Sequence, residues 1–161
     1  MAEFTHLKPN GSLHMVDVSA KNWTERKAIA KANVVFPPEI YPKVLAQDLP
    51  KGDFLACARV AGILAAKKTS ELIPLCHPLP ITQVQIDFKF LPESYALEIT
   101  AEVKTVAQTG VEMEALTAVT ISALTVYDMC KALHKGIRIE NIRLVYKSGG
   151  KSGEVVLEET S

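Results

Sequence analysis

Residues 84–103, VQIDFKFLPESYALEITAEV, decide the fold of this chain. Apolar residues alternate with polar ones in both halves of the stretch, at Val84, Ile86, Phe88 and Phe90 and again at Leu97, Ile99, Ala101 and Val103. This period of two is typical of strands with one buried and one solvated face. Because Pro-Glu-Ser at 92–94 separates the two halves, the stretch predicts a hairpin.

Two helical segments flank this hairpin. Gly52-Asp53 precedes a run rich in small residues, in which apolar side chains recur at helical spacing to about Lys68. Thr-Gly-Val-Glu at 109–112 matches a capping box with Glu112 as the reciprocal capping residue. It predicts a second helix that continues to about Lys135 and is stopped by Gly136.

The remaining elements complete an α+β pattern. We expect short extended segments at 13–18 and 28–36, further strands at 142–146 and 155–157, and proline-rich connections at 37–52 and 74–80. The order strand–helix–strand–strand–helix–strand is that of a ferredoxin-like βαββαβ domain. It predicts an antiparallel sheet with the helices packed on one face and the other face free to pair with a second subunit.

Composition limits the class of protein. The 161 residues fit a single domain covering 1–161, in which the polar, turn-rich residues 1–11 predict a flexible arm. With 48% hydrophobic and 22% charged residues, the chain is not of the disordered type. The 18 basic residues balance the 18 acidic ones, which argues against a nucleic-acid or membrane partner. Three scattered cysteines, with no leader and no long apolar run visible, indicate a cytoplasmic protein.

A glycine-rich turn at 147–153, KSGGKSG, is the most specific local signal. Its end resembles a phosphate loop, but that motif needs a glycine where Val145 stands and a helix where an extended segment follows. What remains is a turn with exposed backbone N–H groups, flanked by Lys147 and Lys151, which suits phosphate oxygens. A plain surface loop between edge strands is the alternative.

The second helix carries four charged residues that could take part in chemistry. Asp128 and Lys131 lie three residues apart on one face, either as a proton-transfer pair or as an ordinary surface ion pair. Glu112 and Glu114 lie in its first turn, and Glu114 precedes a run at 115–123 that we expect to be buried. Since a helix rises ~1.5 Å per residue, Glu114 and Asp128 are roughly 21 Å apart. Either their roles are separate, or a site is assembled from two subunits.

Cys76 and His77 lie between prolines in a rigid connection. No second ligand pair stands at a usable spacing, so we expect no metal site; His77 can instead serve as an acid, a base or a hydrogen-bond donor. Cys76 is alternatively a small buried residue. Several lysines lie near loop and helix ends, among them Lys51 and Lys67, and they favour an anionic ligand. Together with the carboxylates, these lysines predict a small-molecule phosphate site with acid–base residues.

At these residues the sequence resembles one family throughout, the MoaC-type cyclic pyranopterin monophosphate synthases of molybdenum cofactor biosynthesis. The matching segments are MVDVS (15–19), KGD (51–53), AGI (61–63) followed by AAK (65–67), ELIPLCHPL (71–79), TGVEMEALTA (109–118), LT (124–125), YDMCKA (127–132) and KSGGKSG (147–153). They cover nearly the whole chain. The chain departs from the family at 106–108, Val-Ala-Gln, where the family has a glycine and often a lysine, so the resemblance does not extend to a cationic contact there.

The resemblance implies a lyase that converts 3′,8-cyclo-7,8-dihydroguanosine 5′-triphosphate, made from GTP by a preceding radical enzyme, into cyclic pyranopterin monophosphate and diphosphate. It assigns the proton transfers to Asp128 and Lys131. It assigns substrate binding to Arg26, Lys51, Lys67, Leu75, Cys76, His77, Glu112, Met113, Glu114, Lys147 and Lys151. No cofactor is implied, although a divalent ion could accompany the triphosphate. The family assembles as a homohexamer, a trimer of dimers, with each site shared between subunits.

A non-catalytic ferredoxin-like module that binds nucleotides or RNA is the alternative function. Such a module needs exposed aromatic side chains on its sheet and a basic surface. Aromatic residues make up 6% of this chain and its net charge is zero, so the sequence offers little of either.

Overall fold

The computed structural model describes residues 4–159, and the strands in this range form one antiparallel sheet. They are β1 (Thr24–Val35), β2 (Ile81–Leu91), β3 (Ala96–Ala107), β4 (Arg138–Ser148) and β5 (Val155–Val156). The order across the sheet is β2-β3-β1-β4-β5, and every neighbouring pair is antiparallel. The hairpin predicted from residues 84–103 is confirmed as β2 and β3.

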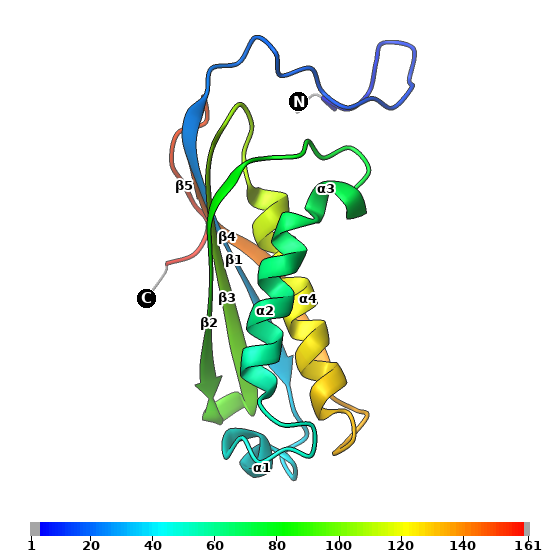
Figure 1. Cartoon of the computed structure of the whole chain (residues 1–161), viewed down its shortest axis with the longest axis vertical. Coiled ribbons are helices and arrows are strands. Elements are labelled where there is room, and N and C mark those ends of the chain that lie inside the picture. Colours follow the sequence, from blue (N-terminus) through cyan, green and yellow to red (C-terminus); the bar gives the residue numbers. More distant parts are fainter. Residues whose placement is uncertain (1–3, 160–161) are drawn as a thin grey trace.

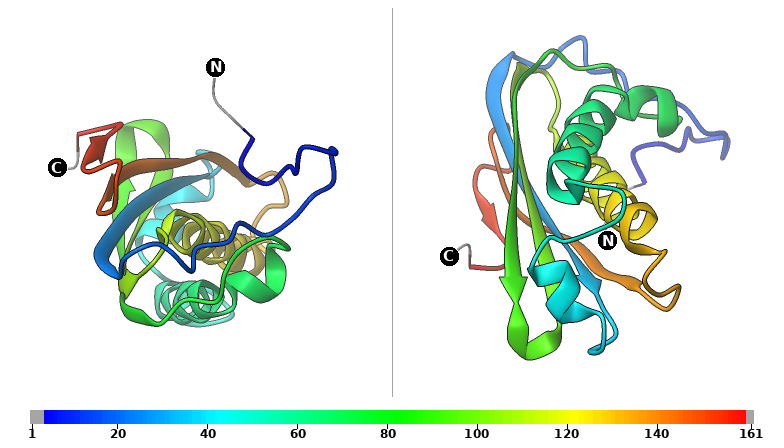
Figure 2. Two further views of the ribbon diagram at one scale, coloured as in Figure 1. Left: turned by 90° about the horizontal axis from the view of Figure 1, so that it is seen from above. Right: turned by 60° about the horizontal axis from the view of Figure 1, so that its bottom comes forward.

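Helices cover one face of this sheet, as expected. They are α1 (Tyr41–Leu45), α2 (Phe54–Lys67), α3 (Thr69–Leu72) and α4 (Glu112–Cys130), with a short 3₁₀ turn at Pro92–Ser94. Figure 1 shows the two long helices, α2 and α4, side by side along one face. No described helix covers the opposite face in either view of Figure 2. The ferredoxin-like α+β fold class is therefore confirmed.

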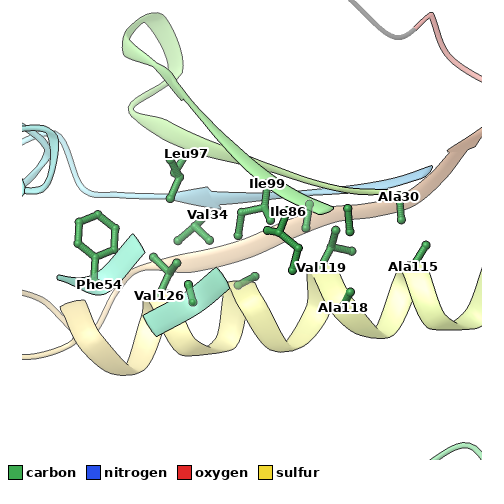
Figure 3. Close-up of a cluster of buried hydrophobic side chains, with 14 of the residues drawn as sticks. Ala30, Val34, Phe54, Ile86, Leu97, Ile99, Ala115, Ala118, Val119 and Val126 are labelled. Carbon is green, nitrogen blue, oxygen red and sulfur yellow. The ribbon is translucent and has the colours of Figure 1, made fainter. Parts of the chain in front are cut away.

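The core lies between the sheet and the two long helices. Inward residues of β1 and β3 alternate with outward ones along both strands, and the inward set is fully buried. In Figure 3, Leu97 and Ile99 of the sheet face Val119 and Val126 of α4. Gly62 of α2 lies close to both α4 and the sheet: a methyl group there would lie 3.0 Å from the Ala118 carbonyl oxygen of α4 and would overlap the end of the Ile86 side chain of β2.

Local motifs explain the start of α2 but not that of α4. The side chain of Asp53 accepts a hydrogen bond from the Ala56 N–H at 3.0 Å and caps α2, as its position before the run suggests. The capping box predicted at 109–112 is wrong, because α4 has Val111 at its N-cap with no side-chain cap. Glu112 turns instead to Lys147, with Oε1 2.7 Å from Nζ.

The predicted end of the second helix is also too late. The structure ends α4 at Cys130, five residues before Lys135, and turns follow. The Tyr127 hydroxyl donates to the Lys135 carbonyl oxygen at 2.8 Å, which holds these turns back against the helix. The chain can then reverse into β4.

The extended element predicted at 13–18 and the loop predicted at 37–52 both need correction. Segment 13–18 joins none of the sheet strands; Leu13 makes only an isolated bridge to Leu7. The proline-rich connection 37–52 contains α1, because Pro42 lies in the first turn of that helix, where no backbone N–H is needed. Of the arm predicted at 1–11, residues 1–3 lie outside the described range, and residues 4–11 turn back toward Ser12 and His14.

Every helix among the residues described is too short or too polar to span a lipid bilayer.

Candidate active site

A cavity of about 620 Å³ lies at the N-terminal end of α4. Three parts of the chain line it: the connection after α3, the start of α4 and the N-terminal segment that precedes β1. Figure 2 shows that N-terminal segment passing over this end of the helix layer. Six residues expected to bind substrate line the cavity together, namely Leu75, Cys76, His77, Glu112, Met113 and Glu114.

His77 ties the N-terminal segment to the cavity. Its Nε2 lies 2.6 Å from the carbonyl oxygen of Val16. Because a carbonyl oxygen can only accept, Nε2 donates this hydrogen bond. Segment 13–18, expected as an extended element, thus serves as a wall of the cavity.

Glu114 is the buried ionisable group of this cavity. Only 4% of the residue is exposed. Burial raises the pKa of its carboxyl to about 7, and the nearby charge of Glu112 also raises it. Burial likewise raises the pKa of the Cys76 thiol, with the charge of Glu114 as a second cause. Glu114 can therefore gain or lose a proton near neutral pH, which suits acid–base chemistry.

The replacement Glu114→Gln is expected to change how stability depends on pH. The folded-state pKa of about 7 lies above the ordinary 4.5, so the native chain binds more protons than the unfolded chain between these values. The contribution of this raised pKa to the free energy of unfolding is fully present below pH 4.5 and is lost as pH rises through 7. Relative to Glu114→Gln, the wild type should lose up to about 3 kcal/mol of unfolding free energy between pH 5 and pH 8. Urea unfolding of both proteins at several pH values measures the difference, and parallel curves would contradict the raised pKa.

Two cations lie at the glycine-rich turn: Lys147 within it and Arg26 packed against it. Lys147 of β4 forms the 2.7 Å ion pair with Glu112. Arg26 of β1 packs under the glycine-rich turn, and its Nη2 donates to the Gln108 carbonyl oxygen at 3.3 Å. Gly149 and Gly150 have positive φ values of 101° and 73°, and a methyl group on Gly150 would overlap the Arg26 guanidinium. The turn predicted to bind phosphate is thus packed onto a cation at this end of the sheet.

A second cluster lies at the opposite end of α4. Oδ1 of Asp128 is 2.8 Å from Nζ of Lys131 and 3.8 Å from Nζ of Lys51. Lys51 also donates to the Asp128 carbonyl oxygen at 3.0 Å. The hydrogen bond from Lys131 is the main cause that lowers the pKa of Asp128, and the same bond raises the pKa of Lys131. A carboxylate and an ammonium are therefore held together at neutral pH.

The two clusters do not meet within one chain. Glu114 and Asp128 belong to the same uninterrupted helix, so the rise per residue separates them by roughly 21 Å. We call the residues around the cavity, with Lys147 and Arg26, the N-terminal cluster, and Lys51, Asp128 and Lys131 the C-terminal cluster. Lys67, at the end of α2, and Lys151, in the glycine-rich turn, are exposed.

Sequence reasoning missed Lys21 and Gln108. Lys21 lines the cavity, and Gln108 contacts both Arg26 and the turn that carries Lys21. The only available signal for Lys21 was its place just after MVDVS at 15–19. Among residues 4–159, no group of three or more His, Cys, Asp or Glu side chains is placed to hold a metal ion.

Comparison with known proteins identifies the family. The model described as "MoaC family" matches residues 15–150. This chain belongs to the MoaC family. The resemblance expected from the motifs is thereby confirmed, and the match covers the C-terminal cluster and all of the N-terminal cluster except Thr5, His6 and Leu13.

Curated relatives of this MoaC-family chain match over nearly its full length. A protein of Roseiflexus castenholzii is 53% identical over 158 residues, which cover 98% of this chain and 100% of that protein. One of Thermomicrobium roseum is 55% identical, covering 95% and 92%. One of Corynebacterium efficiens is 54% identical, covering 96% and 98%. All three are named cyclic pyranopterin monophosphate synthase.

Proposed function

We propose that this chain is a cyclic pyranopterin monophosphate synthase of molybdenum cofactor biosynthesis. The observation that carries the proposal is the identity of 53% to a synthase of that name over 98% of the chain. The reaction is that of a lyase, in which 3′,8-cyclo-7,8-dihydroguanosine 5′-triphosphate becomes cyclic pyranopterin monophosphate and diphosphate. A preceding radical enzyme supplies the substrate from GTP.

Cations at the two clusters suit the triphosphate. Lys147 and Arg26 belong to the N-terminal cluster, and Lys51 belongs to the C-terminal cluster. Exposed Lys67 and Lys151 add charge that is free to move toward phosphate oxygens. Because Lys147 is already paired with Glu112, the phosphate must compete with the Glu112 carboxylate for the Lys147 ammonium. Once released from Lys147, Glu112 would be free to contact the guanine-derived ring.

The remaining residues divide between recognition and proton transfer. Leu75, Cys76, His77, Met113 and Glu114 line the cavity and are proposed to hold the ring system. Asp128 is the proposed base and Lys131 the proposed acid for ring opening and closure. In the cyclisation, a sugar hydroxyl oxygen attacks the α-phosphorus, its proton passes to a base, and the bond to the bridging oxygen of diphosphate breaks.

The separation of the clusters supports a shared site. A molecule that contacts both clusters needs the N-terminal cluster of one subunit and the C-terminal cluster of another. We therefore propose the homohexamer, a trimer of dimers, with sites at subunit contacts. The free thiols of Cys57, Cys76 and Cys130 suit a reducing cytoplasm. We propose no resident cofactor, and any divalent ion would arrive with the triphosphate.

The alternative, a nucleotide- or RNA-binding module, is not favoured. Its base-stacking surface would be the open face of the sheet. That face carries paired charges instead: Lys27 lies 3.4 Å from Glu102, Lys31 lies 3.3 Å from Glu98 and Lys104 lies 3.5 Å from Glu102. Paired charges offer neither a basic surface nor an aromatic platform.

A coupled assay tests the proposed function. The purified chain is added to the preceding radical enzyme with GTP, and pterin product and diphosphate are followed together. Both products should appear in equal amounts and only when this chain is present. Binding of the cyclic triphosphate without turnover would favour a binding module, and no binding would contradict the proposal.

A further inference from the structure

Gln108 lies where the N-terminal segment, strand β1 and the start of α4 come together. It directly follows β3, whose last residue Ala107 pairs with Thr24, the first residue of β1. The antiparallel register therefore places Gln108 beside the residues that precede β1. One residue thus lies between the N-terminal segment, Arg26 and the start of α4.

The side chain and the backbone of Gln108 hold different partners. Its Nε2 donates to the Lys21 carbonyl oxygen at 3.0 Å and lies 3.5 Å from the Ser19 carbonyl oxygen. Its own carbonyl oxygen accepts from Nη2 of Arg26 at 3.3 Å. An amide nitrogen carries two N–H donors and no charge, so it can serve both carbonyls of the turn at once.

The turn held by Gln108 carries cavity residues. Within the turn, Asp17 Oδ1 accepts from the Ser19 N–H at 2.9 Å, and the Lys21 N–H donates to the Val18 carbonyl oxygen at 2.9 Å. Val18 and Lys21 both line the cavity. The internal bonds fix the shape of the turn but not its place on the protein. The hydrogen bonds from Gln108 fix its place from the β3 side.

The geometry points to Gln108 as a positioning residue that holds the turn at 17–21, and with it the Lys21 ammonium, over the substrate cavity. This inference rests on the proposed function, because it assigns Lys21 to the anionic substrate of that site. Gln108 itself touches no reacting atom. Its loss should weaken substrate binding and leave the chemical step unchanged.

Gln108→Met tests the inference, because methionine keeps the length of the side chain and removes both donors. Hydrogen exchange of backbone amides 18–22 should become about three- to ten-fold faster, the range expected for the loss of one or two hydrogen bonds. KM for the cyclic triphosphate should rise by about the same factor, with kcat within about two-fold of wild type. Gln108→Lys restores a donor, so its exchange rates and KM should return to within about two-fold of wild type.

Gln83→Met is the matched control, since Gln83 lies exposed on β2, away from the cavity lining, and should change neither quantity. Unchanged exchange in Gln108→Met would overturn the inference, and so would faster exchange with an unchanged KM. If Gln108→Met lowered the melting temperature and kcat but left KM unchanged, the role of Gln108 would be purely structural, and this result would also overturn the inference. A wild-type chain without turnover would contradict the proposed function, whereas the exchange rates, read without substrate, would still decide whether Gln108 holds the turn.

Discussion

Asp128→Ala is expected to lower kcat by about a thousand-fold, the middle of the range for a lost acid–base group. The carboxylate is the common partner of two ammonium groups, Lys131 at 2.8 Å and Lys51 at 3.8 Å. Its removal takes away the proposed base and releases both cations from their fixed positions. Steady-state rates of pterin formation at saturating substrate measure the effect.

The fold should not suffer from this change. The Asp128 side chain is 58% exposed, and exposed ion pairs contribute little to stability. The melting temperature and the sedimentation coefficient should therefore match those of wild type. Asp87→Ala, which removes an exposed carboxylate from β2, is the control and should keep full activity. Full activity in Asp128→Ala would show that the base lies elsewhere.

The pH profile of the wild type gives a second readout of the same pair. The pKa of Asp128 is lowered and that of Lys131 is raised, so both groups are charged across the neutral range. Neither group should produce an inflection in kcat between pH 6 and pH 8. An inflection near pH 7 would instead report Glu114, whose pKa is about 7.

Periodicity predicted the sheet and the long helices because burial acts on whole segments. The alternation in 84–103 requires one buried face whatever the rest of the chain does, and β2 and β3 follow it. The order of the strands across the sheet was not predictable, since register and neighbours depend on contacts between segments far apart. β1 pairs with both β3 and β4, which lie on opposite sides of α4 in the sequence.

Local motifs failed where a distant charge competed with them. Glu112 had the spacing of a capping residue, but Lys147 of β4 offers it an ion pair at 2.7 Å. An ion pair with a charged side chain is stronger than a hydrogen bond to one backbone N–H, and other groups nearby can accept from that N–H. The sequence contained both residues, yet nothing in their spacing showed that β4 would bring them together.

The candidate site was predictable residue by residue but not as an arrangement. Residues in long motifs, such as His77 and Glu114, were found and do line one cavity. Gln108 and Lys21 were missed because their roles arise from the register of β1 against β3. The rise of a helix, by contrast, is fixed by geometry alone, so the separation of Glu114 from Asp128 was correctly predicted from sequence.

Two inactive variants are expected to restore activity when they are made together. Asp128→Ala damages the C-terminal cluster. Lys147→Ala damages the N-terminal cluster and leaves Glu112 unpaired beside the phosphates, with a roughly hundred-fold loss of kcat/KM expected for a lost charged contact. If each site is shared between two subunits of a dimer, as proposed, either variant alone damages both sites of every dimer. A mixed dimer has one site with both substitutions and one site with neither.

Co-expression of the two variants in equal amounts should therefore yield about one quarter of wild-type activity, since half the dimers are mixed and half of their sites are intact. The matched control co-expresses Asp128→Ala with Lys131→Ala. Both substitutions lie in the C-terminal cluster, so every site receives one damaged copy and no activity should return. Equal recovery in the two experiments would point to changes in assembly rather than to complementary sites. If the first pair of variants recovered no activity, the whole site would lie within one chain. Because α4 separates the two clusters by roughly 21 Å, the substrate would then contact only one cluster.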